Sequence, residues 1–179
     1  MNFEYYVNYF KMLEDRLQST ERYVAFDEDN ISTFSVEYAS IINECCALIN
    51  GFCYDLCKNR RPDKKEFFMN DYKREILKNN YNAKEYIGFD KYILQPWGSL
   101  VKFSLESKES TPFWWLRYND VKHAGETKFK ESTLKNAISC LAGMFWLLYN
   151  YDLNQMGTKM SNWHGAFFDM GNCDKEISW

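Results

Sequence analysis

Glycine and proline are scarce in this sequence of 179 residues, with 8 and 3 copies respectively. Both residue types punctuate chains that turn often, so their scarcity argues against a sandwich of many short strands and favours long helices. Strong positive charge is also lacking, because the formal net charge is −3. Nucleic-acid binding would therefore have to use a local basic patch rather than the charge of the whole protein.

Several familiar sequence signatures are missing. The chain contains no GxxxxGK[ST], GxGxxG, HExxH or GxSxG motif, so P-loop nucleotide hydrolysis and zinc-hydrolase chemistry have no support. No apolar signal segment follows Met1, and the most apolar run, residues 138–149, is too short to cross a bilayer. We expect a soluble, cytoplasmic protein with no membrane segment and no cofactor.

The cysteines do not form the paired spacings of a zinc site. No CxxC pair occurs, and Cys46, Cys53 and Cys57 follow one another at helical spacings of seven and four. We therefore expect the cysteines to be small buried hydrophobic residues in a reducing compartment, and we expect no metal site. The full set is Cys45, Cys46, Cys53, Cys57, Cys140 and Cys173.

Hydrophobic residues make up 46% of the chain and aromatic residues 18%, enough for a substantial core. The length favours one domain over residues 1–179. Apolar residues recur at steps of three and four, which predicts an all-α fold, a bundle of about five main helices. The expected helices are residues 3–18, 33–57, 63–78 and 113–123, and a fifth that begins at Thr127 or Ser132 and continues through Tyr149. Residues 79–110 are expected to be an irregular insertion, and the tail from Asn154 an irregular C-terminus.

Local signals mark several of the expected helix ends. Ser32 or Thr33 can cap the second helix, and Asp63 with Glu66 resembles the capping box of the third. A basic stretch surrounds that third helix. Residues 58–78 hold eight basic and four acidic residues, which is typical of a solvated helix face and is also a candidate nucleic-acid patch.

The segment WWLRYNDVKHAG, residues 114–125, gathers the residues best suited to chemistry. In a helix Asn119 and His123 share a face, whereas Arg117 and His123 diverge by about 120° around the axis. A histidine can move protons near neutral pH, and an arginine can clamp phosphate oxygens. A histidine at the C-terminal end of a helix can also interact favourably with the helix dipole, so a catalytic and a structural role of His123 both stay open. The other histidine, His164, is expected to be structural.

At these residues the sequence resembles the HEPN superfamily, small all-α domains that include RNA-cleaving toxins and phage-defence proteins. The family signature is an arginine, four to six residues and a histidine, and here five residues separate Arg117 from His123. The surrounding Tyr-Asn-x-Val-Lys-His pattern and the long apolar helix after it extend the resemblance over residues 111–152. Tyr118 departs from the pattern, because active members commonly carry a polar residue there.

The resemblance implies a metal-independent endoribonuclease, toxin-like or related to phage defence, that leaves a 2′,3′-cyclic phosphate. His123 would act as base or acid at the ribose 2′-hydroxyl, Arg117 would hold the phosphate, and Asn119 would position the substrate or the histidine. Tyr118 and Lys122 would contact the RNA. A homodimer is implied, and an antitoxin or another protein partner is conceivable. The alternative is a non-catalytic HEPN-like protein that dimerises or binds a partner.

Overall fold

The computed structural model describes residues 1–79, 81, 83, 85–90, 92–102, 110–156, 165–170 and 177–178. Across these residues the protein is mostly helical and carries a small β-sheet. The α-helices are α1 (Phe3–Thr20), α2 (Val36–Arg60), α3 (Met69–Lys78), α4 (Phe113–Ala124) and α5 (Leu134–Met156). Short 3-10 helices are η1 (Glu28–Asn30), η2 (Gly98–Lys102) and η4 (Gly125–Glu131). The prediction of a largely helical chain is confirmed, and five α-helices lie among the described residues.

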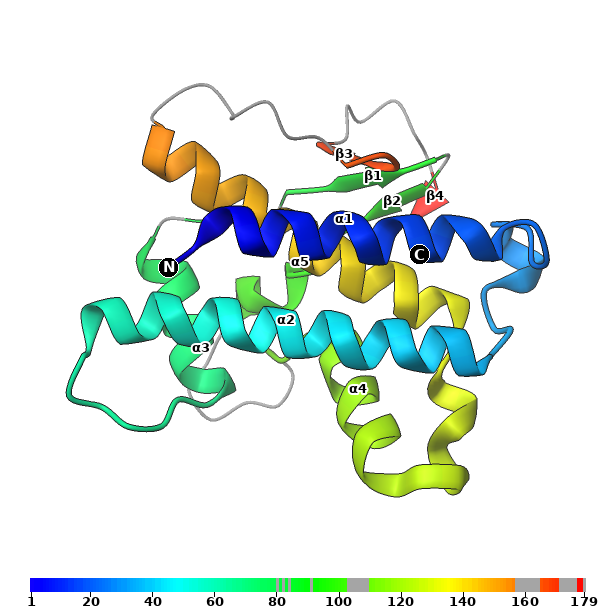
Figure 1. The fold of residues 1–179 in the computed structure, drawn as a ribbon, viewed down its shortest axis with the longest axis horizontal. Coiled ribbons are helices and arrows are strands. Elements are labelled where there is room, and N and C mark those ends of the chain that lie inside the picture. The colour runs from blue at the N-terminus through cyan, green and yellow to red at the C-terminus, as the bar shows by residue number, and fades with distance from the viewer. Residues whose placement is uncertain are drawn as a thin grey trace.

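Helices α1, α2 and α5 pack against one another and form the centre of the bundle (Figure 1). Helix α1 contributes one apolar face, on which Phe10, Leu13 and Leu17 are fully buried at helical spacing. Helix α5 is enclosed on nearly all sides, because consecutive residues such as Cys140, Leu141 and Ala142 have no exposed surface. The long apolar run seen in the sequence is therefore a core helix. Helices α3 and α4 also pack against α2, and α4 lies on the side of α2 away from α1.

Two predicted helix starts lie elsewhere. Helix α2 begins at Val36, and its cap is Ser35, whose hydroxyl accepts a hydrogen bond from the N–H of Tyr38. Helix α3 begins at Met69 instead of 63, where the Asp71 side chain accepts from the N–H of Phe68. The residues before α3 run as an extended loop because buried Phe67 packs edge-on against Tyr54 of α2, with ring centroids 5.4 Å apart.

The all-α prediction misses a small β-sheet. Strands β1 (Ile87–Phe89) and β2 (Tyr92–Leu94) form an antiparallel hairpin inside the predicted irregular insertion. From the predicted irregular tail, β3 (Phe168–Met170) pairs antiparallel with β1, and β4 (Ile177–Ser178) pairs parallel with β2. Strands of two or three residues are too short to show an alternating pattern, so the sequence carried no clear signal for them.

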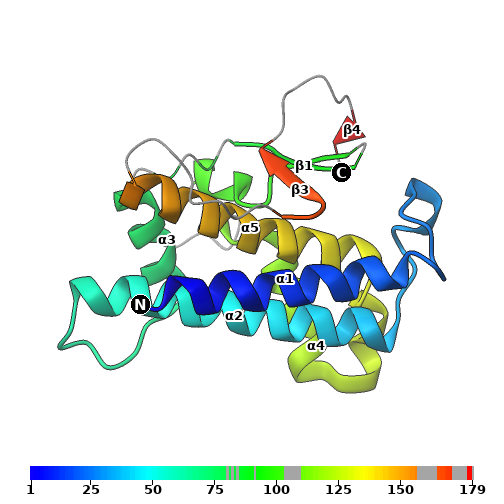
Figure 2. The same cartoon turned by 45° about the horizontal axis from the view of Figure 1, so that its top comes forward.

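The sheet covers α5 on the face away from α4, alongside α1 (Figure 2). At Gly88, where β1 meets β3, an added Cβ atom would collide with Oδ1 of Asp169, so a larger residue there would displace the Asp169 side chain. Buried Glu14 of α1 holds the adjoining segment, since its carboxylate accepts from the N–H of Phe167 at 2.8 Å. Among the helices that the structure describes, none is long and apolar enough to cross a membrane.

Candidate functional site on helix α4

The first half of the α4 motif is a buried anchor. Trp114 has no exposed surface, and its indole N–H donates to the carbonyl oxygen of Pro96 at 2.9 Å. Trp97 meets this ring edge to face, with centroids 5.3 Å apart, and its own N–H donates to the carbonyl oxygen of Gly143 in α5. Two buried indoles with satisfied N–H groups therefore fix the start of α4 on α5.

The second half of the motif carries the polar side chains. Arg117 is half-exposed and forms ion pairs with Asp120, 3.0 Å away on the same helix, and with Glu131 at the end of η4, 3.4 Å away. These contacts use its Nη1 and Nε atoms, while Nη2 has no hydrogen-bond partner in the described part of the chain. The guanidinium is thus held in one orientation with one nitrogen still available.

His123 and Asn119 lie one helical turn apart near the C-terminal end of α4. The His123 side chain is exposed and Asn119 is half-buried. Neither forms a hydrogen bond or ion pair within the residues that the structure describes, so His123 is not engaged by a neighbouring carboxylate or loop there. Both side chains are accessible to a ligand.

Arg117 and His123 do not converge within one helix. Helix α4 runs unbroken from Phe113 to Ala124, so these residues lie about 9 Å apart along its axis and about 120° apart around it. The divergence expected from the sequence spacing therefore holds in the folded chain. A site that uses both groups on one phosphate needs either a bend of the arginine side chain or a second copy of the helix.

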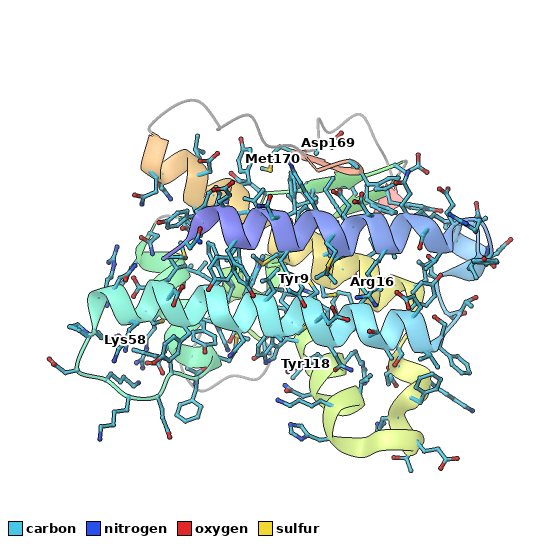
Figure 3. All side chains as sticks on the ribbon, in the orientation of Figure 1. Tyr9, Arg16, Lys58, Tyr118, Asp169 and Met170 are labelled. Carbon is cyan, nitrogen blue, oxygen red and sulfur yellow. The ribbon has the colours of Figure 1, made fainter. Side chains whose placement is uncertain are left out.

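The two residues expected to contact RNA differ in their exposure. Tyr118 is only 8% exposed, and its ring packs against Trp115, with centroids 5.4 Å apart. Lys122 is exposed, and its ammonium lies 5.4 Å from the centre of the Tyr118 ring. Figure 3 shows Tyr118 on α4. Tyr118 is thus a packing residue with little surface for stacking on a base, whereas Lys122 presents a charge to solvent.

Most of the basic stretch at 58–78 is engaged within the protein rather than spread over a free helix face. Arg61 and Lys64 both contact the Asp71 carboxylate at 2.8 Å, and Arg60 contacts Glu75 at 2.6 Å. Lys73 is buried, and its ammonium donates to the hydroxyls of Ser110 and Thr111. The ammonium of Lys58 donates to the carbonyl oxygens of Pro62 and Lys64. Exposed Lys65, Arg74 and Lys78 remain, so this stretch offers less charge to RNA than its composition indicates.

The cysteines of the described ranges are free and buried, as predicted for small core residues. They are Cys45, Cys46, Cys53, Cys57 and Cys140. Burial raises the pKa of the Cys45 and Cys46 thiols well above their ordinary value, so these groups stay protonated. No cluster of three or more metal-ligating side chains occurs among the described residues. Cys173 and His164 lie outside them.

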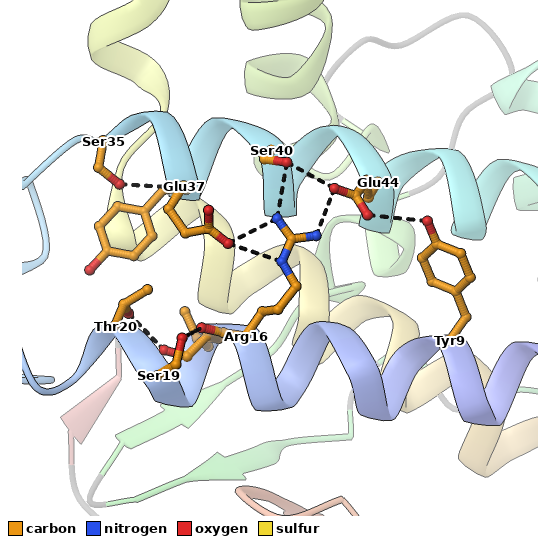
Figure 4. Close-up of polar contacts among 10 residues, drawn as sticks. Tyr9, Arg16, Ser19, Thr20, Ser35, Glu37, Ser40 and Glu44 are labelled. Atoms are coloured by element: carbon orange, nitrogen blue, oxygen red, sulfur yellow. Dashed lines mark hydrogen bonds and ion pairs between the residues drawn. The ribbon is translucent and has the colours of Figure 1, made fainter.

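A cluster of polar side chains between α1 and α2 was not predicted from the sequence (Figure 4). Arg16 of α1 contacts the carboxylates of Glu37 and Glu44 on α2, at 2.8 and 2.7 Å, and donates to the hydroxyl of Ser40. Tyr9 of α1 donates to Glu44 at 3.1 Å. Each of these residues reads as an ordinary polar position on an amphipathic helix. Only the packing of α1 on α2 brings them together.

No protein-family model, no curated protein and no solved structure matches this chain.

Proposed function

We propose that this protein is a metal-independent endoribonuclease of the HEPN type, toxin-like or related to phage defence, which works as a homodimer. The observation that carries the proposal is the accessible His123–Asn119 pair at the end of a helix whose start is fixed by buried tryptophans. A catalytic group is most effective on a rigid element that leaves its reacting atoms free. The type of reaction, cleavage of RNA, is inferred from the resemblance of the Arg117-x5-His123 spacing to the HEPN signature.

The proposed reaction is an internal transesterification of RNA. One His123 removes the proton from a ribose 2′-hydroxyl, and the 2′-oxygen attacks the neighbouring phosphorus. The bond from phosphorus to the 5′-oxygen then breaks, and His123 of the second copy donates a proton to that leaving oxygen. The products are a 2′,3′-cyclic phosphate and a 5′-hydroxyl. Two copies of α4 are invoked because the acid and the base must act on opposite sides of one phosphate.

Arg117 stabilises the charge that develops on the phosphate. Asp120 and Glu131 orient its guanidinium and leave Nη2 for a phosphate oxygen. Asn119 positions the substrate or the histidine ring, and exposed Lys122 contacts the RNA backbone. The surrounding segment favours an anionic ligand, because residues 113–135 hold five basic and three acidic side chains whereas the whole chain is net negative.

The test incubates the purified protein with mixed cellular RNA in excess EDTA and analyses the fragment ends. We expect cleavage with cyclic-phosphate ends, reduced about 100- to 10,000-fold by His123→Ala and about 100- to 1,000-fold by Arg117→Ala. Arg22→Ala is the matched control, since Arg22 is an exposed basic residue outside α4 and η4. Cleavage that survives His123→Ala would assign the activity to another group or to a contaminant.

Two observations favour a second candidate function: the charge of Arg117 is already compensated, and α4 exposes apolar surface. Two carboxylates already compensate the arginine charge, and Phe113 and Leu116 expose 44% and 41% of their surface. Both features suit a non-catalytic protein that dimerises or binds a partner, such as an antitoxin, through α4. Intact RNA in every lane, together with a dimer that Leu116→Glu dissociates, would favour this function over the nuclease.

A further inference from the structure

A groove between α1 and α2 lies apart from the α4 site. Its volume is about 210 Å³. Tyr5, Tyr6 and Tyr9 line it from α1, and Glu44 and Gly51 line it from α2. Figure 3 places Tyr9 between the two helices on the face that also shows Arg16, whereas Tyr118 of α4 lies beyond α2.

Three tyrosine rings form the α1 wall of this groove. The Tyr5 ring lies next to both of the others, with its centroid 5.2 Å from Tyr6 and 6.0 Å from Tyr9. Tyr6 is buried against Phe52, whereas Tyr5 leaves 53% of its surface exposed. Aromatic faces attract cations within about 6 Å of the ring centre. An exposed tyrosine next to two others is therefore a suitable surface for a positively charged group.

The hydrogen bonds of the groove leave acceptors for a ligand and few donors. The Tyr6 hydroxyl donates to Asp55 at 2.9 Å, and the Tyr9 hydroxyl donates to Glu44 at 3.1 Å. With their hydrogens directed at carboxylates, both phenol oxygens can only accept from a further partner. Burial raises the pKa of both tyrosines, so they remain neutral donors to these carboxylates.

The charge of the groove is negative. Arg16 is the cation beside it, and this guanidinium is already shared between Glu37 and Glu44. Its hydrogen bond holds the pKa of Glu44 below the ordinary value, so Glu44 is ionised at neutral pH. Asp55 adds a third carboxylate near the groove, which accepts from Tyr6 alone within the described ranges. The Arg16 guanidinium contacts only Glu37 and Glu44, so its single positive charge leaves the three carboxylates with a net negative charge.

From this arrangement we infer that the groove of Tyr5, Tyr6, Tyr9, Glu44 and Gly51 binds a primary alkylammonium group. The ammonium donates to the Glu44 carboxylate and the phenol oxygens, and its alkyl chain lies along the tyrosine faces. Gly51 leaves the floor open, since the nearest side-chain atom to a Cβ built there is Tyr6 Oη at 3.5 Å. A free polyamine and a lysine side chain share this chemistry.

The test follows the backbone amide signals of Ala47, Leu48 and Gly51 by NMR during titration with n-butylammonium chloride at constant ionic strength. We expect saturation with a Kd on the order of 1 mM, which is reasonable for a ligand of about five non-hydrogen atoms. Neutral 1-butanol and anionic butanesulfonate should not saturate these signals. Equal binding of 1-butanol would overturn the inference, because the groove would then recognise apolar surface alone. Failure of butylammonium to saturate would also overturn it.

Single substitutions measure separately how much the tyrosine rings and the Glu44 charge contribute to binding. Tyr5→Ala should weaken binding about two- to fivefold, as expected for a cation–π contact at an exposed site. Tyr23→Ala is the matched control, because Tyr23 is an 83% exposed tyrosine away from the groove and its loss should change nothing. Glu44→Gln should weaken binding about tenfold, and Gly51→Leu should abolish it by filling the floor. Unchanged affinity in both Tyr5→Ala and Gly51→Leu would refute the site.

The source of the ammonium group is then distinguished with two further probes, spermidine and Nα-acetyl-lysine methylamide. Saturation by the lysine derivative alone assigns a protein partner, and saturation by spermidine alone assigns a free polyamine. Saturation by neither would contradict the inference even if butylammonium binds, because no natural form of the ligand would fit. These measurements do not depend on RNA cleavage, so failure of the ammonium site would not contradict the proposed nuclease, and the reverse also holds.

Discussion

Replacing Gly143 by alanine tests how rigidly the tryptophans hold α4 against α5. A Cβ atom at Gly143 would lie 2.8 Å from Cζ2 and 3.2 Å from Cε2 of Trp114. The indole has little room to retreat, since its N–H is bonded to Pro96 and its ring abuts Trp97. The same helix should otherwise gain from the change, because alanine is favoured over glycine by about 1 kcal/mol in a helix interior.

The two effects can be separated with a second glycine. Overpacking a rigid core typically costs about 1–3 kcal/mol, so after the helix gain Gly143→Ala should destabilise the protein by about 0–2 kcal/mol. Gly51→Ala in α2 meets only ordinary contact, 3.5 Å from Tyr6 Oη, and should stabilise by about 0.5–1 kcal/mol. The free energies of unfolding of the two variants should therefore differ by about 1–3 kcal/mol.

Urea denaturation followed by circular dichroism measures this difference directly. In thermal unfolding each 1 kcal/mol corresponds to a Tm change of about 2–4 °C for a chain of this size. The double variant Gly143→Ala with Trp114→Phe should recover part of the loss, because the smaller ring vacates the contact. Equal stabilisation by Gly51→Ala and Gly143→Ala would refute the reasoning and show that Trp114 moves aside freely.

Further predictions concern two buried carboxylates. Burial alone would raise the pKa of Asp71, but hydrogen bonds from Lys64, the Phe68 N–H and Arg61 lower it to about 2. The ionised carboxylate therefore adds stability above its ordinary pKa of 3.8, and this is lost as the pH falls through 2. Asp71→Asn should cost about 1–2 kcal/mol at pH 7 and little at pH 2; a loss independent of pH in urea titrations would contradict this. For Glu14, burial raises the pKa more than the N–H donors of the β3 segment lower it. The native state then binds the extra proton, so unfolding free energy should decrease as the pH rises just above 4.5, relative to Glu14→Gln. Glu14→Ala should speed hydrogen exchange at the Phe167 amide, because that donor loses its acceptor; unchanged protection there would show that the β3 segment is held by other contacts.

The helices were predictable because their signal is local. Apolar residues at steps of three and four mark the buried faces of α1 and α5, and Pro112 marks the start of α4, where the N–H of Trp115 bonds its carbonyl oxygen. The start of α3 was misplaced because Asp63 and Glu66 resemble a capping box, whereas the tertiary contact of Phe67 with Tyr54 keeps that segment extended. The sheet was missed because β1 pairs with a strand some 80 residues later in the chain.

The residues of the candidate site could be named from the sequence, but their contacts and burial could not. Helical spacing correctly separates Arg117 from His123, since α4 contains both without a break. Asp120 is a local partner of Arg117, three residues along the same helix, but Glu131 could not be foreseen because only the fold of η4 brings it to Arg117. The burial of Tyr118 against Trp115 was equally hidden, since an aromatic residue beside polar neighbours reads the same whether it is buried or exposed.

The helices and the polar character of α4 follow from local sequence, because both depend on residues within a few turns of one another. Which charges are free depends on the packing of distant segments. Asp71 and Glu75 compensate much of the basic stretch, and Arg16 joins two carboxylates across α1 and α2. The negative, tyrosine-lined groove exists only where those two helices pack, because ion pairs and ring contacts depend on distance in space rather than on separation along the chain.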